Sequence, residues 1–223
     1  MKLLTMAETL VSTHYGKDYF AYQEHIGRFG GWANQPKFQN YIRPADVLLD
    51  FGCGGGYLLR NLVAARKIGV EPNSTAAEVA ASNIHEVYKT AAEVPDEIVD
   101  LVISDNAFEH TLYPLAELKT LFTKLRPGGK IVLVVPCENV SFAYRPNDIN
   151  HHLYSWGPMS LGNLLTEAGF RVLESKPYIH KWPPLYRYVA AIGGRVGFEI
   201  ACRIWGRLAR NWFQVRAVAE RPT

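Results

Sequence analysis

A glycine-rich loop near residue 50 has the residue types of a nucleoside site. The segment Asp50-Phe-Gly-Cys-Gly-Gly-Gly56 follows a short apolar run and precedes a helical stretch that begins at Tyr57. Glycines let the backbone turn sharply and approach a ligand closely, and N–H groups at a helix start favour an anionic or polar ligand group. Glu71 ends the next apolar run, 19 residues after Gly52, where a carboxylate can accept both hydroxyl protons of a ribose. The alternative is a tight turn that binds nothing.

The glycine spacing argues against a dinucleotide. The fingerprint G-x-G-x-x-G would need its third glycine at Tyr57 or at Leu59, depending on the register. A loop headed by Asp50 suits instead a ligand that carries a cation, because a carboxylate holds an ammonium group by charge-assisted hydrogen bonds. An NAD-linked oxidoreductase is therefore a disfavoured alternative.

The polar segment 137–157 offers candidates for proton transfer. It contains His151, His152 and Tyr154 and follows an apolar run that ends at Val135. A histidine titrates near neutral pH, so His151 or His152 is a candidate general base for an acceptor hydroxyl. The alternative is that each ring caps the following helix or bonds to the loop backbone.

His110, which follows another apolar run, is a further catalytic candidate. Its alternative role is to cap the helix that begins at Pro114. A metal site built from Glu138, Asp148 and His151 is also conceivable, but their spacing matches no recognised ligand pattern. We therefore expect no metal.

The elements that must position these residues alternate between strand and helix. The alternation predicts an α/β fold with a Rossmann-like, seven-stranded, mostly parallel sheet and helices on both faces. Such sheets bind ligands outside the carboxyl ends of their strands, and Ser74 is the expected N-cap of one helix. The expected strands are 47–50, 67–70, 86–89, 98–104, 130–135, 170–175 and 213–219, and the expected helices are 57–65, 74–82, 114–125 and 158–168.

Two segments fall outside this alternation. Residues 1–44 look helical and are rich in aromatic residues, and residues 179–212 are too long for a plain loop in a compact domain. We expect a single domain over 1–223, with a core at 45–178 and the last strand at 213–223.

Positive charge is concentrated near the C-terminus. The chain has a net charge of +3, but residues 171–223 carry 10 Lys or Arg against 3 Asp or Glu, a net charge of +7. A helical projection of Arg195–Trp212 places arginines on one face and apolar and aromatic residues on the other. This composition is typical of a helix that lies on anionic lipid. The alternative is a helix that packs on its own domain or on a second subunit.

The composition excludes several classes of protein. Hydrophobic residues make up 48% and charged residues 20% of the chain, which excludes a disordered, collagen-like or coiled-coil protein. Cys53, Cys137 and Cys202 are far apart and odd in number, which fits a reducing cytoplasm. We see neither a signal peptide nor a transmembrane run. We expect a cytoplasmic protein, or one peripheral at the inner face of the membrane, and no nucleic-acid partner.

Four motifs in order resemble class I S-adenosylmethionine-dependent methyltransferases. They are Val47-Leu-Leu-Asp-Phe-Gly-Cys-Gly-Gly-Gly56, Gly69-Val-Glu-Pro72, the segment 100–110 and Leu125-Arg-Pro-Gly-Gly-Lys-Ile131. The resemblance covers roughly 40–178. It implies S-adenosylmethionine as cofactor, with S-adenosylhomocysteine as product, and it implies that the helical segment 1–44 is a lid over a cofactor-binding core.

The resemblance also implies roles for individual residues. Asp50 and the loop glycines would cradle the methionine and ribose parts, Glu71 would bind the ribose hydroxyls, and Asn106 would lie beside the methionine end. Many relatives bind adenine with an Asp where this chain has Thr90, so the backbone near Ala91 is expected to serve instead. The expected cofactor-binding residues are Asp50, Gly52, Cys53, Gly54, Gly56, Glu71, Pro72, Ala91, Ala92, Asp105, Asn106 and Tyr19.

The whole-chain pattern is similar to methyltransferases of bacterial polysaccharide and lipopolysaccharide gene clusters. The similarity includes Asp148-Ile-Asn-His-His-Leu-Tyr154 and the basic amphipathic insertion 179–212. It implies in-line O-methylation of a sugar or glycolipid hydroxyl, on a small-molecule or lipid-linked acceptor. The alternatives are an amine or small-lipid acceptor, and a non-catalytic cofactor-binding or membrane-docking module. The oligomeric state stays open, a homodimer included.

Overall fold

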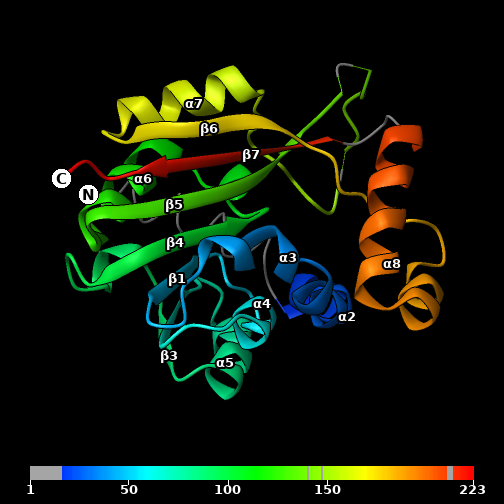
Figure 1. The fold of residues 1–223 in the computed structure, drawn as a ribbon, viewed down its shortest axis with the longest axis horizontal. Coiled ribbons are helices and arrows are strands. Elements are labelled where there is room, and N and C mark those ends of the chain that lie inside the picture. The colour runs from blue at the N-terminus through cyan, green and yellow to red at the C-terminus, as the bar shows by residue number, and fades with distance from the viewer. Residues whose placement is uncertain (1–16, 140, 147, 210–212) are drawn as a thin grey trace.

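A seven-stranded sheet forms the centre of the computed structural model (Figure 1). The structure describes residues 17–139, 141–146, 148–209 and 213–223, with the backbone alone for 17–23. The strands are β1 Val47–Phe51, β2 Arg66–Val70, β3 Glu86–Tyr88, β4 Val99–Asp105, β5 Leu125–Cys137, β6 Arg171–Tyr178 and β7 Phe213–Glu220. The helices are α2 Lys17–Ala33, α3 Gln35–Phe38, α4 Tyr57–Asn61, α5 Ser74–Asn83, α6 Pro114–Lys124, α7 Pro158–Glu167 and α8 Tyr186–Ala209, with 3-10 turns η1 Gln39–Tyr41, η2 Ala91–Glu93 and η3 Phe108–His110.

The strand order is β3-β2-β1-β4-β5-β7-β6. Strands β1 to β5 pair in parallel, whereas β7 runs antiparallel to both β5 and β6. The mostly parallel sheet with flanking helices confirms the expected fold class. The carboxyl ends of the parallel strands point toward the side of Figure 1 where α2 and α8 lie.

Helices cover both faces of the sheet because the strands are apolar on both sides. Successive side chains of a strand point to opposite faces, so neighbouring apolar residues of one strand pack into two separate cores. One core joins Leu49, Val102 and Leu133 to α6 and α7. The other joins Leu48, Ile103 and Val132 to α3, α4 and α5. Strands buried on both faces are typical of parallel sheets.

Helix α4 is shorter than the sequence predicts. It ends at Asn61 rather than Ala65, since Leu62 takes an extended conformation with φ −95° and ψ 151°. The N–H groups of Ala65 and Arg66 then donate to the carbonyl of Asp46. This turn returns the chain to the edge of β1, where β2 must begin.

The N-cap of α5 is Asn73, not Ser74. The side-chain oxygen of Asn73 accepts hydrogen bonds from the N–H groups of Thr75 and Ala76. The N–H of Asn73 itself donates to Glu71 over 2.9 Å. That contact holds Asn73 in the extended conformation that a cap requires.

Strand β5 begins five residues earlier than predicted, at Leu125. Residues 126–129 distort the strand, with Gly128 at φ +77°. The pairing register with β4 shifts there, between Val99 and Leu101. Strand β6 also runs longer than predicted, to Tyr178.

Helix α8 packs on α2 rather than on the sheet (Figure 1). It begins before the predicted start and contains a break at Gly194, where φ is 56° and ψ is −161°. Phe198 and Cys202 are buried together with Ala33, and Phe198 also contacts Trp32, with ring centroids 5.3 Å apart. The two segments that fell outside the strand–helix alternation therefore share a small aromatic core.

The apolar face predicted for the helix at Arg195–Trp212 is divided in the structure. Phe198 and Cys202 are buried, whereas Ile204 and Leu208 are exposed. Arg210 and Trp212 lie outside the described residues. No described helix is long and apolar enough to cross a membrane.

The contact between α2 and α4 requires a glycine. A Cβ on Gly31 would lie 2.4 Å from the backbone oxygen of Tyr57. Gly31→Ala should lower the free energy of unfolding by about 1–3 kcal/mol, because the two helices must separate. Urea unfolding followed by circular dichroism measures this change.

Gly197→Ala is the matched control, since a Cβ there meets no heavy atom within 4 Å. Alanine in a helix interior is favoured over glycine by about 1 kcal/mol, so this variant should be at least as stable as the parent. Equal stability of the two variants would contradict the close approach of α2 to α4.

Candidate functional site

The loop after β1 forms a cradle with a left-handed backbone. Gly52, Gly54 and Gly56 have φ values of +76°, +51° and +73°, a region that side chains disfavour. A Cβ on Gly52 would lie 2.3 Å from the Cβ of Ala107. A Cβ on Gly54 would meet nothing within 4 Å. The backbone is thus exposed to a ligand at Gly54 and packed against the end of β4 at Gly52.

Glu71 ties the end of β2 to this cradle. Its carboxylate accepts hydrogen bonds from the N–H groups of Gly54 and Asn73, at 2.8 and 2.9 Å. Burial raises the pKa of Glu71, and these two N–H groups act in the opposite direction. Glu71 therefore orders the loop in addition to any contact with a ribose. Pro72 follows it on the surface.

Asp50 is a buried carboxylate at the end of β1. Its side chain belongs to a residue that is 2% exposed, and within the described ranges no donor is bonded to it. Burial raises the pKa of Asp50 well above its ordinary value, and the charges of Asp105 and Glu71 add to this effect. A cationic ligand group beside Asp50 would offset both the loss of hydration of its carboxylate and the repulsion from Asp105 and Glu71. The ammonium group of S-adenosylmethionine has the required charge, so these residues fit the expected cofactor.

Asp105 and Asn106 lie at the end of β4, beside the cradle, and each is held by partners that the sequence does not point to. Lys37 donates to Asp105 over 2.9 Å and Asn34 does so over 2.7 Å. Gln214 of β7 donates to Asn106 over 2.9 Å. The sequence offers one weak signal for these partners, a polar Gln214 at a buried position of an apolar strand.

The remaining expected cofactor residues are less well defined. Ala91 is buried and Ala92 exposed in η2, and the carbonyl of Ala92 accepts a hydrogen bond from Lys124 at 3.5 Å. Cys53 is buried in the cradle, and burial raises the pKa of its thiol well above the ordinary value. The side chain of Tyr19, in α2, lies outside the described residues.

Two of the candidate catalytic histidines come together past the carboxyl ends of β4 and β5. The rings of His110 and His152 have centroids 5.1 Å apart. Because a carboxylate only accepts, Nδ1 of His152 donates to Glu138, over 2.9 Å. His151 is exposed, and its N–H donates to Asp148. Its backbone has a φ of +47°.

The segment that carries these histidines is fastened to Glu109. The N–H groups of Leu153 and Tyr154 donate to the carbonyl of Glu109, at 2.8 and 3.3 Å. The hydroxyl of Tyr154 donates to the carbonyl of Leu112, and its ring stacks on Trp156. These contacts give Tyr154 a structural role in the site.

Glu109 is the feature of the site that sequence reasoning left without a role. Its side chain is 0% exposed, and burial raises the pKa of its carboxyl to about 8. The sequence signal that could have identified it is a Glu directly before His110, shortly after the apolar run 98–104.

Comparison with protein families and curated proteins gives consistent matches. A model of the methyltransferase domain family matches residues 16–175. An uncharacterized methyltransferase of Anoxybacillus flavithermus is 27% identical over 153 residues, which cover 58% of this chain and 72% of that protein. A probable S-adenosylmethionine-dependent methyltransferase of Mycolicibacterium smegmatis is 30% identical over 142 residues, which cover 60% of this chain and 55% of that protein.

Solved structures share the fold at low identity. The methyltransferase bound to the Haloferax volcanii Trm112 activator has a TM-score of 0.68 and 18% identity, with 96% of this chain and 98% of that chain covered. The Haemonchus contortus phosphoethanolamine N-methyltransferase 2, in complex with phosphomonomethylethanolamine and S-adenosylhomocysteine, has a TM-score of 0.60 and 14% identity, with 87% and 53% covered.

Replacing the buried carboxyl of Asp50 should stabilise the ligand-free chain at neutral pH. Since the folded-state pKa of Asp50 is raised above 3.8, the folded chain binds more protons than the unfolded chain, and stability falls as pH rises above about 4. Asp50→Asn should unfold at higher urea concentration than the parent, with the difference growing as pH rises toward 8.

Glu167→Gln, at an exposed position on α7, is the control and should leave this pH dependence unchanged. An Asp50→Asn protein that is less stable than the parent at pH 8 would show that Asp50 has a favourable partner in the ligand-free fold.

Proposed function

The chain belongs to the methyltransferase domain family and is a class I S-adenosylmethionine-dependent methyltransferase, and from this premise we propose that it methylates a hydroxyl group of a sugar or glycolipid. The proposal rests on the two neighbouring imidazoles of His110 and His152, which lie past the ends of β4 and β5. His152 is hydrogen-bonded to Glu138. An acceptor hydroxyl must lose its proton, which calls for a base. The choice of a sugar rests on the resemblance that we expect from the sequence, in the segment Asp148-Ile-Asn-His-His-Leu-Tyr154 and the insertion 179–212.

The cofactor supplies a methyl group on a positively charged sulfur, so the protein's task is alignment and exclusion of water. Asp50 would hold the ammonium group of the cofactor, and Glu71 would hold its ribose hydroxyls. Asn106 lies beside the methionine end, where Gln214 fixes its side-chain amide. Lys37 holds Asp105 at the same edge.

The acceptor proton passes to a histidine of the segment 137–157. Glu138 orients His152 through Nδ1, which leaves Nε2 as the atom that accepts a proton. His151 is the other candidate on the same segment. Tyr154 positions this segment through its bond to Leu112.

Loss of both histidines should separate methyl transfer from cofactor binding. His151→Ala with His152→Ala should reduce transfer about 10²–10⁴-fold, the range typical of general-base catalysis. The assay uses S-adenosylmethionine labelled in the methyl group and an extract of the source cells, with products partitioned between butanol and water. Label in butanol indicates a lipid-linked acceptor, and label in water a soluble one.

His85→Ala, at an exposed position before β3, is the control and should retain transfer. Calorimetry with S-adenosylhomocysteine should give the same affinity for all three proteins. Full transfer by the double variant would exclude His151 and His152 as the base and count against proton transfer by the segment 137–157.

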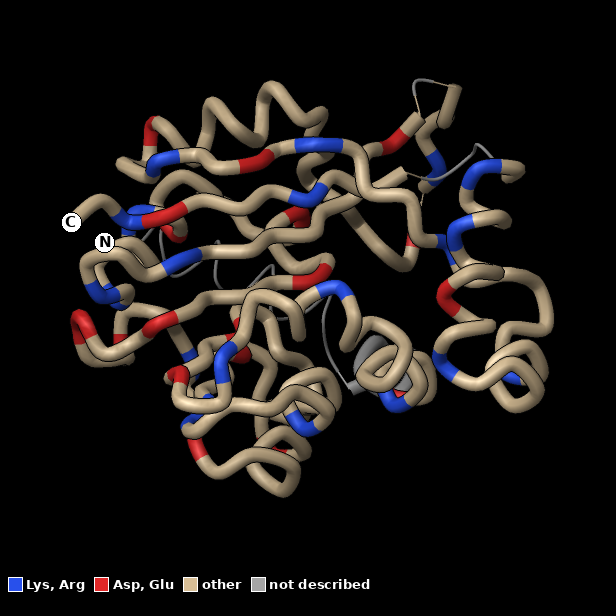
Figure 2. The backbone as a smooth tube through the Cα atoms, viewed as in Figure 1, with Lys and Arg blue, Asp and Glu red and all other residues tan. Residues whose placement is uncertain are grey.

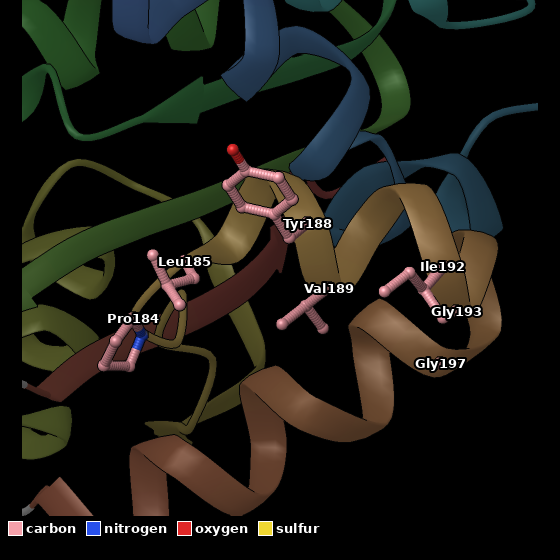
Figure 3. Close-up of a pocket in the computed structure, with 7 residues that line it drawn as sticks. All are labelled: Pro184, Leu185, Tyr188, Val189, Ile192, Gly193 and Gly197. Atoms are coloured by element: carbon pink, nitrogen blue, oxygen red, sulfur yellow. The ribbon is translucent and has the colours of Figure 1, made fainter.

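We further propose that α8 holds the enzyme at an anionic membrane surface. After the break at Gly194, exposed apolar side chains recur every four residues along α8, at Val196, Ile200, Ile204 and Leu208, and the exposed Ile192 lies just before the break. They continue into an apolar hollow of about 420 Å³ (Figure 3), lined by Pro184, Leu185, Tyr188, Val189, Ile192, Gly193 and Gly197.

Basic residues lie on the same helix (Figure 2). Arg203 and Arg207 are exposed between and beside these apolar side chains. An apolar stripe flanked by arginines matches a surface of acyl chains and anionic headgroups. It would place the acceptor site near lipid-linked sugars.

Cosedimentation with vesicles that contain anionic phospholipid tests this surface. Arg203→Glu with Arg207→Glu should abolish binding, because two attractive charges become repulsive. Lys89→Glu with Lys119→Glu makes the same charge change at exposed positions outside α8 and should bind like the parent. Binding by the parent should also weaken at high salt. A parent protein that stays in the supernatant ends this proposal.

A further inference from the structure

The site contains a cluster of metal-ligating side chains that the cofactor does not use. Glu109, His110 and His152 each place one ligand atom within 4.8 Å of the other two. Glu109 and His110 come from η3, directly after β4, and His152 comes from the segment after β5. The cluster differs from the set Glu138, Asp148 and His151 that the sequence led us to consider and set aside.

The carboxylate of Glu109 is the observation that points to a ligand. Its two oxygens are buried, and neither has a hydrogen-bond partner within the part of the chain that the structure describes. A buried carboxyl group without a hydrogen-bond partner is unfavourable, and such groups in a native structure call for an explanation such as a bound ion. Nε2 of His110 lies 3.9 Å from Oε1 of Glu109, on the same side as His152.

Further contacts orient the side chains of the cluster in a way that is common around metal ligands. Glu138 accepts from Nδ1 of His152 at 2.9 Å, and carboxylates commonly orient a metal-binding imidazole in this way. The remaining nitrogen, Nε2, is then the one that would bind an ion. The backbone bonds from Leu153 and Tyr154 to Glu109 fix the distance between the two segments.

We propose that Glu109, His110 and His152 bind one divalent transition-metal ion. One carboxylate with two imidazoles suits Zn²⁺, Fe²⁺ or Mn²⁺, whereas sets of oxygen ligands alone suit Mg²⁺ and Ca²⁺. Ligand atoms around a tetrahedral ion lie about 3.3 Å apart, so side-chain shifts of about 1 Å close the site.

Three protein ligands leave coordination positions open. An ion at this place can bind an oxygen of the acceptor and lower the pKa of its hydroxyl, a role that rests on the proposed function. Binding of the ion itself does not depend on the acceptor. With His152 as a ligand, His151 is the imidazole of the segment that remains for the acceptor proton.

Titration of the full chain with Mn²⁺ tests the proposal. The protein is stripped with a chelator, and free Mn²⁺ is followed by its electron paramagnetic resonance signal. The parent should bind one Mn²⁺ per chain. Glu109→Gln and His152→Ala should each weaken binding at least tenfold, and Glu138→Gln should weaken it about 10–100-fold, as expected for an orienting partner.

His151→Ala and His85→Ala are the matched controls and should bind Mn²⁺ like the parent. Calorimetry with S-adenosylhomocysteine checks that each variant is folded. If Glu109→Gln does not fold, the single variants His152→Ala and Glu138→Gln still test the site. A parent that binds S-adenosylhomocysteine but neither Mn²⁺ nor Zn²⁺ overturns the metal site, as does unchanged Mn²⁺ affinity in the variants.

The same measurements separate this inference from the proposed function. Mn²⁺ binding that depends on Glu109 and His152, in a protein that transfers label only to an amine, supports the ion and overturns the hydroxyl acceptor. Transfer to a hydroxyl that survives chelation and the Glu109→Gln change supports the hydroxyl acceptor and overturns the role of the ion in the transfer, whereas the Mn²⁺ titration alone decides whether the ion binds.

Discussion

Burial of carboxylates at one edge of the sheet is the constraint on which the site depends. Asp50, Glu71 and Asp105 lie at the ends of three neighbouring parallel strands. Each carboxylate loses hydrogen bonds to water there and needs donors from the protein or a ligand instead. Glu71 obtains backbone N–H groups of the glycine loop. Asp105 obtains Lys37 and Asn34, which thereby fasten the N-terminal helices to the sheet. Asp50 has no such donor among the described residues, and in our proposal the positive charge of the cofactor would take that place.

The features predictable from sequence are those that a short stretch of chain determines. The glycine loop, Glu71 and the alternation of strands are local, and the structure contains them where they were expected. The partners of the site are not local. Lys37 is 68 residues from Asp105, and Gln214 is 108 residues from the side chain of Asn106. Their meeting depends on how α3 and β7 dock, which no local pattern encodes.

The structure differs from the sequence-based picture where contacts between distant segments decide which side chains come together. The apolar residues of α8 were expected on one face of the helix, against lipid or against a protein surface, but the aromatic core with α2 buries only Phe198 and Cys202 of that face. The rest of the apolar side chains remain on the surface. Likewise, the histidines after β5 were grouped by closeness in sequence. In the structure, the hydrogen bonds to the Glu109 carbonyl bring His152 against His110, so a residue of the neighbouring strand end decides the composition of the cluster.

The position of β7 between β5 and β6 sets an order for assembly during synthesis. β6 cannot join the sheet when it leaves the ribosome, because its partner is made more than thirty residues later. Until then the outer edge of β5 and both edges of β6 lack partners, a state in which strands pair with other chains. The same late insertion delivers Gln214 to Asn106. The hydrogen bond that fixes the Asn106 side chain at the edge of β4 therefore forms only after β7 has been synthesised and inserted between β5 and β6.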